Sequence, residues 1–294
     1  LIPINLSISP NDLKCLVVIP CYNAANTVDR AAISVRNYYP NWDIVVIDDF
    51  STDQTKTKLK KLKRDGIVDG AIFHNQRMGV SAARNSGLSW GETTDREFII
   101  FLDADDHLLA IDQNIELNPT DDLIFFESVE VSNTYTDFRE YKNHLIKINR
   151  IRQERIGDLL EGFCLQPNKS FLFNTSWAKL FRADLIYKYQ LKFNEKMHTF
   201  EDIDFNFKFM RFAREMRFIK EQLYVHAHPK VKGKTATYGN DFPVANLFSF
   251  IWSVRSMRRY VKQRLNCREL NYKHLIACYF SISSIRAASR ICSL

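Results

Sequence analysis

Glycine and proline are scarce in this chain, with 9 and 8 residues among 294. These counts argue against a collagen-like, linker-rich or broadly disordered chain. No run of about 20 uncharged apolar residues occurs, so we expect no transmembrane helix, and no signal peptide is visible. The six cysteines show no CxxC spacing, which argues against a zinc site or a disulfide framework, and we expect reduced thiols in a cytoplasmic protein.

Two common phosphate-binding signatures are also missing. The chain contains neither GxxxxGKS/T nor GxGxxG, so any bound phosphate would depend on a metal ion and on arginine. The length of 294 residues suits one large domain or two modest ones. A change of character beyond Pro229 predicts an α/β domain over residues 13–240 and a C-terminal helical region over 241–294. Because the first residue is Leu1 rather than Met, we expect a piece of a longer protein.

Basic residues outnumber acidic ones, 41 to 34, and the formal net charge is +7. Such a balance favours anionic partners, which include nucleotides, phospholipid surfaces and nucleic acid. The charge and the many aromatic residues keep a nucleic-acid-binding module as one hypothesis. Against it, acidic residues cluster at the predicted functional edge, where they would repel a phosphate backbone without metal. We therefore expect no nucleic acid partner.

Apolar runs alternate with helical patterns along the chain. Strands are predicted near residues 16–20, 43–47, 70–74, 98–102 and 122–127, with helices over 24–38, 56–64 and 81–90 between the first four. This alternation predicts an α/β fold with a mostly parallel sheet flanked by helices. Farther along, helices are predicted over 177–189 and 205–217, and a last strand over 223–228.

Three carboxylates follow the apolar run 98–102, namely Asp103, Asp105 and Asp106. An unpaired charge is too costly to bury inside a strand, so we expect these groups at the strand's carboxyl end, where open α/β sheets bind ligands. Asp103 and Asp105 are two residues apart, and their oxygens could converge on Mg²⁺ or Mn²⁺ with phosphates completing the shell. The alternative is an acidic helix N-terminus.

Polar groups end two further strands. Asp48 and Asp49 follow one of them, and Pro20-Cys21-Tyr22-Asn23 ends another. If the strands are neighbours, a tyrosine can stack on a base, while asparagine and carboxylates hydrogen-bond the base or its ribose. Arg84, early in a predicted helix, could pair with phosphate or with one of these carboxylates, or lie on the surface.

Candidate groups also occur later in the chain. Glu201 and Asp202 precede an apolar helix, where acids are favoured in any case; beside a metal-bound leaving group, one of them could deprotonate an acceptor hydroxyl. His226 and His228 share a face of the last strand, and either one ligates a cation or both are ordinary core or edge histidines. Trp177 is more typical of a core than of a binding platform.

Six short motifs follow one another along the chain: Val18-Ile19-Pro20-Cys21-Tyr22-Asn23, Val46-Ile47-Asp48-Asp49-Phe50-Ser51-Thr52-Asp53, Ala83-Arg84-Asn85-Ser86-Gly87, Leu102-Asp103-Ala104-Asp105-Asp106, Trp177-Ala178-Lys179-Leu180 and Glu201-Asp202. In this order they closely resemble family 2 glycosyltransferases with the GT-A fold, of the bacterial capsule and lipopolysaccharide type. The resemblance covers residues 14 to 230. Each motif is weak alone, but the ordered set is specific.

The resemblance implies a role for each matching residue. On the donor side, Pro20, Tyr22 and Asp49 would contact the base and ribose, and Arg84 would lie by the nucleotide or its diphosphate. In the DxD motif, Asp103 would point toward the ribose and Asp105 would bind the metal, while Asp106 would approach the donor sugar. Asp202 matches the catalytic base, with Glu201 and Trp177 on the acceptor side.

The chain departs from the family pattern at three places. Phe50 stands where glycine is usual, which suggests a slightly different loop. Ala178 stands where asparagine is usual, which puts acceptor-side contacts in doubt. The family often has a histidine near the metal, a role that His228 would take, but the segment Val225-His226-Ala227-His228 departs from the commoner Tyr-Arg-x-His, so the choice between His226 and His228 stays open.

The reaction implied by the resemblance is an inverting, metal-dependent sugar transfer. A nucleotide sugar, with UDP favoured, would donate to a hydroxyl of a glycan or lipid-linked glycan in bacterial surface polysaccharide synthesis, forming a β-glycosidic bond with Mn²⁺ or Mg²⁺. A catalytically inactive GT-A scaffold subunit is the alternative. Hydrolysis of sugars by a pair of acids does not explain the nucleotide-type strand ends.

The C-terminal region contains a basic amphipathic pattern over residues 248–268. Such a helix could lie on an anionic inner-membrane surface near a lipid-linked acceptor, or pack on the catalytic domain with its basic face in solvent. The less polar segment 279–291 could dock or mediate self-association, or the region could join a further domain. We expect a cytoplasmic protein, with peripheral contact at the inner membrane under the first alternative.

Overall fold

The computed structural model describes residues 9–10, 12–112, 118, 120–132, 138–139, 151–152, 171–228 and 244–264. Its first half alternates strands and helices: β1 (Cys15–Cys21), α1 (Val28–Tyr38), β2 (Asp43–Asp48), α2 (Thr55–Arg64), β3 (Gly70–Phe73), α3 (Val80–Gly91), β4 (Phe98–Phe101) and β5 (His107–Leu108). The remaining elements are β6 (Leu123–Ser132), β7 (Phe138–Arg139), β8 (Ile151–Arg152), α5 (Phe171–Asn174), β9 (Lys179–Arg182), α6 (Ala183–Lys188), α7 (Glu201–Met210), β10 (Glu215–His228) and α8 (Val244–Arg264).

One sheet runs through the described residues in the order β3-β2-β1-β4-β9-β6-β10-β5. β1 pairs in parallel with β2 and β4, β2 with β3, and β6 with β10. β9 is antiparallel to both β4 and β6, and β5 is antiparallel to β10. The predicted α/β fold with a mostly parallel sheet is therefore confirmed.

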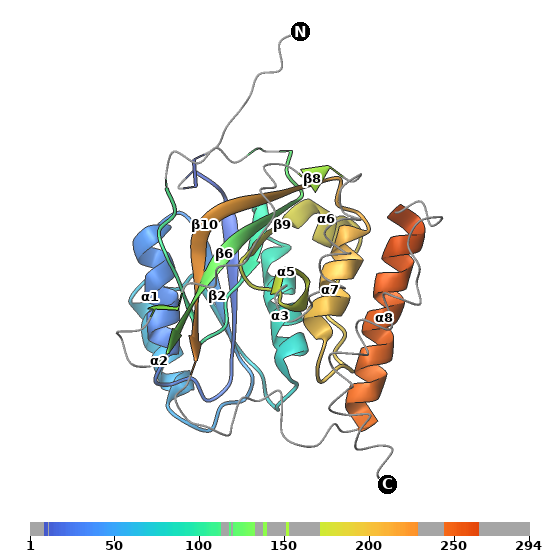
Figure 1. Cartoon of the computed structure of the whole chain (residues 1–294). Coiled ribbons are helices and arrows are strands. Elements are labelled where there is room, and N and C mark those ends of the chain that lie inside the picture. The colour runs from blue at the N-terminus through green and yellow to red at the C-terminus, as the bar shows by residue number, and fades with distance from the viewer. Residues whose placement is uncertain are drawn as a thin grey trace.

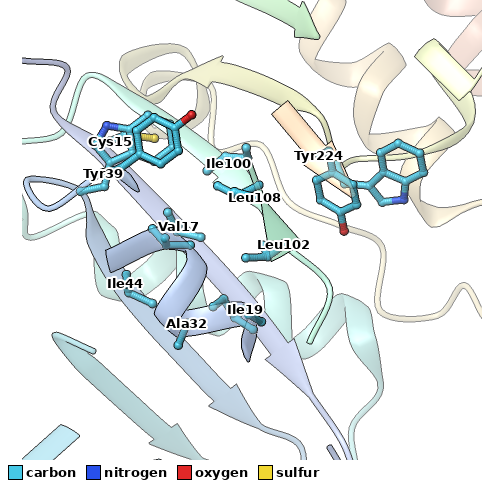
Figure 2. Packing of buried hydrophobic residues seen from close by; sticks show 14 of the residues in the cluster. Cys15, Val17, Ile19, Ala32, Tyr39, Ile44, Ile100, Leu102, Leu108 and Tyr224 are labelled. Carbon is cyan, nitrogen blue, oxygen red and sulfur yellow. The ribbon is translucent and has the colours of Figure 1, made fainter. Parts of the chain in front are cut away.

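Helices cover both faces of the sheet, with α1 and α2 on one side and α3, α7 and α8 on the other (Figure 1). Side chains of β1 alternate between two cores: Leu16 and Val18 face the α3 side, while Val17 and Ile19 face the α1 side. Figure 2 shows the second core, where Val17 and Ile19 lie near Ala32 of α1. A strand covered on both faces is apolar at every position, which explains the continuous apolar run.

Two predicted helices are wrong in part. Residues 177–189 contain the short strand β9 and then α6, because Leu180 and Phe181 are each buried in a different core within the sheet. The helix predicted over 205–217 begins at Glu201 and ends at Met210, and β10 already starts at Glu215. In both segments pairing with neighbouring strands overrides the local pattern.

Helix α8 packs against α7. The Ser256 hydroxyl donates to Asp204 at 2.5 Å, and the His198 amide donates to the Ser249 hydroxyl at 3.2 Å. Tyr260 is fully buried, with its ring centroid 5.6 Å from that of Phe207. The C-terminal helix is thus part of the α/β body, whereas the boundary predicted near residue 240 lies outside the described residues. Within those residues, no helix is long and apolar enough to cross a bilayer.

Candidate active site

A cleft of about 700 Å³ opens at the carboxyl ends of β1 and β4. The chain proceeds from β1 through β2 to β3 on one side, and β4 then pairs with the other side of β1. Open α/β sheets bind ligands at such a switch point, and the volume lies within the usual range for small-molecule sites. Several predicted site residues line the cleft: Pro20, Tyr22, Asn23, Arg84, Asp103, Asp105 and Glu201.

Arg84 joins three of the predicted carboxylates. Its Nη1 donates to Asp202 Oδ1 at 2.7 Å and lies 3.5 Å from Glu201 Oε1, while Nη2 donates to Asp103 Oδ1 at 3.2 Å. The Arg84 side chain is only 4% exposed. One guanidinium thus connects the first turn of α7 to the end of β4. Pairing with a carboxylate was one of the alternatives predicted for Arg84.

Burial and charge act against each other in this cluster. Burial alone would lower the pKa of Arg84, but the charges of Asp202, Asp103 and Glu201 raise it above its usual value. For Glu201, burial and then the neighbouring charge of Asp202 raise the pKa to about 7, with Arg84 opposing. The cluster therefore holds more negative charge than one guanidinium compensates.

The DxD carboxylates lie on the cleft with different exposure. Asp103 is 32% exposed, and its backbone amide donates to the Tyr224 hydroxyl at 3.1 Å. Asp105 is exposed, while its backbone carbonyl accepts a hydrogen bond from Arg30 Nη2 at 2.5 Å. Arg30 also lines the cleft and its Nε is buried without a partner. Arg30 was not among the predicted site residues, because it lies outside the six motifs and nothing in its neighbourhood in the sequence distinguishes it from other basic residues.

Asp106 turns away from the cleft. It is fully buried, and accepts hydrogen bonds from the Tyr224 hydroxyl at 2.6 Å and the Ala227 amide at 2.8 Å. His226 Nδ1 lies 3.1 Å from the same carboxylate; burial would lower the pKa of His226, but Asp106 raises it to about 9. Asp106 thus fastens β10 to the end of β4, which differs from the expected contact with a donor sugar.

Trp177 is also placed differently from its predicted acceptor role. It is 9% exposed and stacks on Tyr224 and His226, with ring centroids 4.7 and 5.6 Å apart. Two residues on, Lys179 is buried, and its ammonium donates to the carbonyl oxygens of Thr175 at 2.7 Å and Trp177 at 3.1 Å. Burial lowers the pKa of Lys179 to about 7. Both side chains support the segment before β9 rather than the cleft.

Asp49 is buried beneath the turn that precedes α3. Its oxygens accept the amides of Met78 at 2.8 Å and Gly79 at 2.7 Å, and His74 Nδ1 lies 2.8 Å away. These contacts occupy the carboxylate that was expected at the base and ribose. Tyr22 is 39% exposed, and the Arg77 guanidinium lies 4.0 Å from its ring centroid, so an aromatic face is present at the mouth of the cleft.

A left-handed backbone conformation occurs at Asn23 and also at Phe50 and Ala178, two positions that differ from the family pattern. Asn23 has φ 51°, and its Oδ1 accepts the Thr52 amide at 2.8 Å, which ties the loop after β1 to the loop after β2. Phe50 has φ 63° and Ala178 has φ 54°. Glycine and asparagine tolerate this region best, so Phe50 and Ala178 hold a backbone conformation that strains a residue with their side chains.

Among the described side chains, two carboxylates, Asp103 and Asp105, are candidate metal ligands, and they do not form a complete coordination shell. In the described part of the chain, no group of three or more His, Cys, Asp or Glu residues is arranged to hold a metal ion. Mg²⁺-type ions bound with nucleotides commonly use one or two carboxylates plus phosphates and water, and Asp103 and Asp105 fit that need. The side chain of His228 lies outside the described residues.

Residues 16–112 match the family model described as Glycosyl transferase family 2. This part of the chain is similar to glycosyltransferase family 2 domains. It contains the ends of β1, β2 and β4 together with Arg84, and thus much of the lining of the cleft. Glu201 and Asp202 lie beyond the matched residues, and the fold brings them to the domain through Arg84.

Relatives of this chain include bacterial transferases. The Escherichia coli UDP-Glc:alpha-D-GlcNAc-diphosphoundecaprenol beta-1,3-glucosyltransferase WfgD is 32% identical over 101 residues, which are 34% of this chain and 38% of that protein. The uncharacterized glycosyltransferase YibD of E. coli K12 is 27% identical over 216 residues, 72% of this chain and 60% of that protein. The chain therefore spans less than two thirds of either relative.

A solved structure supports the GT-A fold of the whole described body. S. aureus TarS in complex with UDP-GlcNAc superposes with a TM-score of 0.61 and 17% identity, covering 92% of this chain and 73% of that one. At this identity the likeness concerns the fold, which extends well beyond the matched family 2 segment.

Proposed function

We propose that the chain transfers a sugar from a UDP-sugar to a hydroxyl of a glycan or lipid-linked glycan during bacterial surface polysaccharide synthesis. The observation that carries this proposal is Arg84, which lines the cleft with Asp103 and Glu201 and joins both of them to Asp202. The WfgD relative, whose name gives a UDP-linked donor and a diphosphoundecaprenol-linked acceptor, supports the same class of reaction.

The donor would occupy the end of β1 and the DxD loop. The exposed ring of Tyr22 offers a stacking surface for the base, and Pro20 and Asn23 line the same cleft. Asp103 and Asp105 would hold Mn²⁺ or Mg²⁺, with His228 as a further candidate ligand. When bound, such an ion neutralises charge on a departing diphosphate.

Asp202 would act as the general base. Its Oδ1 accepts the Arg84 hydrogen bond, so Oδ2 is the oxygen that can take the proton from an acceptor hydroxyl. The acceptor oxygen bonds to the anomeric carbon as the bond to the diphosphate oxygen breaks, and the electron pair leaves with the diphosphate. This single displacement inverts the anomeric centre and gives a β-glycoside from an α-linked donor. Glu201, beside the base, would contact the acceptor.

The proposed setting is the cytoplasm, with peripheral contact at the inner membrane. Cys15 and Cys21 are buried free thiols, which suits a reducing compartment. On α8, Phe248 and Ile251 are exposed apolar residues, and the arginines at 255, 258 and 259 are exposed as well. An anionic lipid surface would attract such a face.

Calorimetry and thermal shift test the proposal with UDP, GDP, CMP, dTDP and a panel of UDP-sugars, each with Mn²⁺ and with EDTA. We expect metal-dependent stabilisation by the uridine compounds, lost in Asp105→Ala. We expect Asp202→Asn to bind nucleotide normally and to lose transfer, with Asp95→Asn, a change at an exposed surface carboxylate, as matched control. Nucleotide loss in Asp202→Asn would refute the base assignment. No response from the folded wild type would favour the inactive scaffold.

A further inference from the structure

A second cavity, of about 540 Å³, lies beside the cleft and is lined by residues before α7, by the end of α7 and by α8. Five of its lining side chains are basic and one is acidic: Lys192, Lys196, Lys208, Arg211, Arg259 and Glu195. We call it the basic cavity. Its size is within the range of sites that hold a small ligand or a short stretch of a polymer.

Several basic side chains of the basic cavity form no ion pair with the described carboxylates of the protein. Lys208 pairs with Asp204 at 2.6 Å. Lys192, Lys196 and Arg259 are exposed, and their side chains form no ion pair with the described carboxylates. The acidic member, Glu195, accepts the side-chain amide of Asn85 at 2.8 Å. An anion entering this cavity therefore meets available cations.

The walls of the basic cavity are held in place by buried contacts. The Phe193 amide donates to Asn85 Oδ1 at 2.9 Å, and the Phe193 ring stacks on Phe205 with centroids 4.0 Å apart. Tyr189 and Phe212 stack at 3.8 Å. Because these contacts order the lining segment without a ligand, binding would need little further ordering of the backbone.

The basic cavity and the proposed active site share a wall. The Phe193 ring lines the cavity, and the Arg84 guanidinium lies 5.2 Å from its centroid. Lys196 lines the cavity, whereas His198, two residues farther on, lines the cleft beside Glu201. A polymer whose end lies at Glu201 and Asp202 can pass over residues 196–198 and reach the basic cavity.

We propose that the basic cavity binds phosphate or carboxylate groups of the acceptor glycan, on the segment that precedes the hydroxyl receiving the sugar. The inference rests on the proposed function, which it deepens by assigning the acceptor to the class of anionic glycans. A neutral glycan offers no charge to Lys192, Lys196 and Arg259, whereas hydrogen bonds between these cations and anionic groups would supply both affinity and register along the glycan.

Calorimetry with three probes tests the assignment. Inorganic tripolyphosphate represents the phosphate source, trigalacturonate the carboxylate source, and maltotriose is the neutral control. The test variant is Lys196→Gln with Arg259→Gln. The matched control is Lys60→Gln with Lys61→Gln, which removes the same charge from exposed positions of the very basic helix α2. Binding of UDP with Mn²⁺ is measured on every variant.

We expect one anionic probe to bind the wild type and maltotriose not to bind. The cavity variant should weaken anion binding by about tenfold or more, because two charge-assisted contacts are lost, and the α2 control should change it by less than about twofold. Equal weakening in both variants, or no anion binding by the wild type, would overturn the inference. If UDP with Mn²⁺ still binds in that case, the inference fails and the proposed function stands. Absent UDP binding together with intact anion binding would count against the proposed function alone.

Discussion

The surroundings of Glu201 disfavour the ionised form of its carboxyl group. Replacing Glu201 by glutamine is therefore a quantitative test of the charge balance in the carboxylate cluster. Burial and then the charge of Asp202 raise the pKa of Glu201 from 4.5 to about 7. Between pH 4.5 and about pH 7, the Glu201 carboxyl group is protonated in the folded chain and ionised in the unfolded chain. The free energy of unfolding therefore falls as pH rises through this window and stays low above it.

The size of the effect follows from the same two pKa values. A rise from 4.5 to about 7 corresponds to about 3 kcal/mol of lost stability at alkaline pH. The Glu201 side chain is 15% exposed and its contact with Arg84 is long, at 3.5 Å, so little favourable pairing is lost with the carboxylate. Glu201→Gln should be neutral near pH 4.5 and more stable than the wild type above pH 7, by up to about 3 kcal/mol.

Urea denaturation at pH 4.5 and at pH 8, with ionic strength fixed, measures both values. Glu92→Gln, at an exposed position just after α3, is the matched control and should show no comparable gain at pH 8. If Glu201→Gln changed the free energy of unfolding equally at both pH values, or destabilised the protein at pH 8, the described charge balance would be wrong.

Two further predictions concern backbone and packing, and urea denaturation reads both. Phe50→Gly should exceed Phe50→Ala in stability by about 1 kcal/mol, because the left-handed backbone at φ 63° strains any residue with a Cβ; the reverse order would contradict this. Gly87→Ala should cost about 1–3 kcal/mol, since a Cβ there would collide with Val18 and approach Ile47, whereas exposed Ser89→Ala on the same helix should be nearly neutral.

The site residues show where reasoning from the sequence stops. Asp103, Asp105, Asp106 and Asp49 all follow apolar strands, yet only the first two line the cleft. A carboxylate that faces a ligand and one that accepts backbone amides fit the same local pattern, because either can follow a buried strand at the point where charge need no longer be excluded. The partners of Asp106 come from β10, more than a hundred residues away, and no spacing rule predicts them.

Local apolar periodicity and the cost of burying charge were enough to predict the alternating elements, the mostly parallel sheet and the edge at which the polar groups gather. The folded structure was needed to show that β9 enters the middle of the sheet, that Arg84 joins acids from the end of β4 and from α7, and that α8 lines the basic cavity. Those outcomes depend on which surfaces pack together across long separations in the chain, and a linear pattern of residue types does not encode that pairing locally.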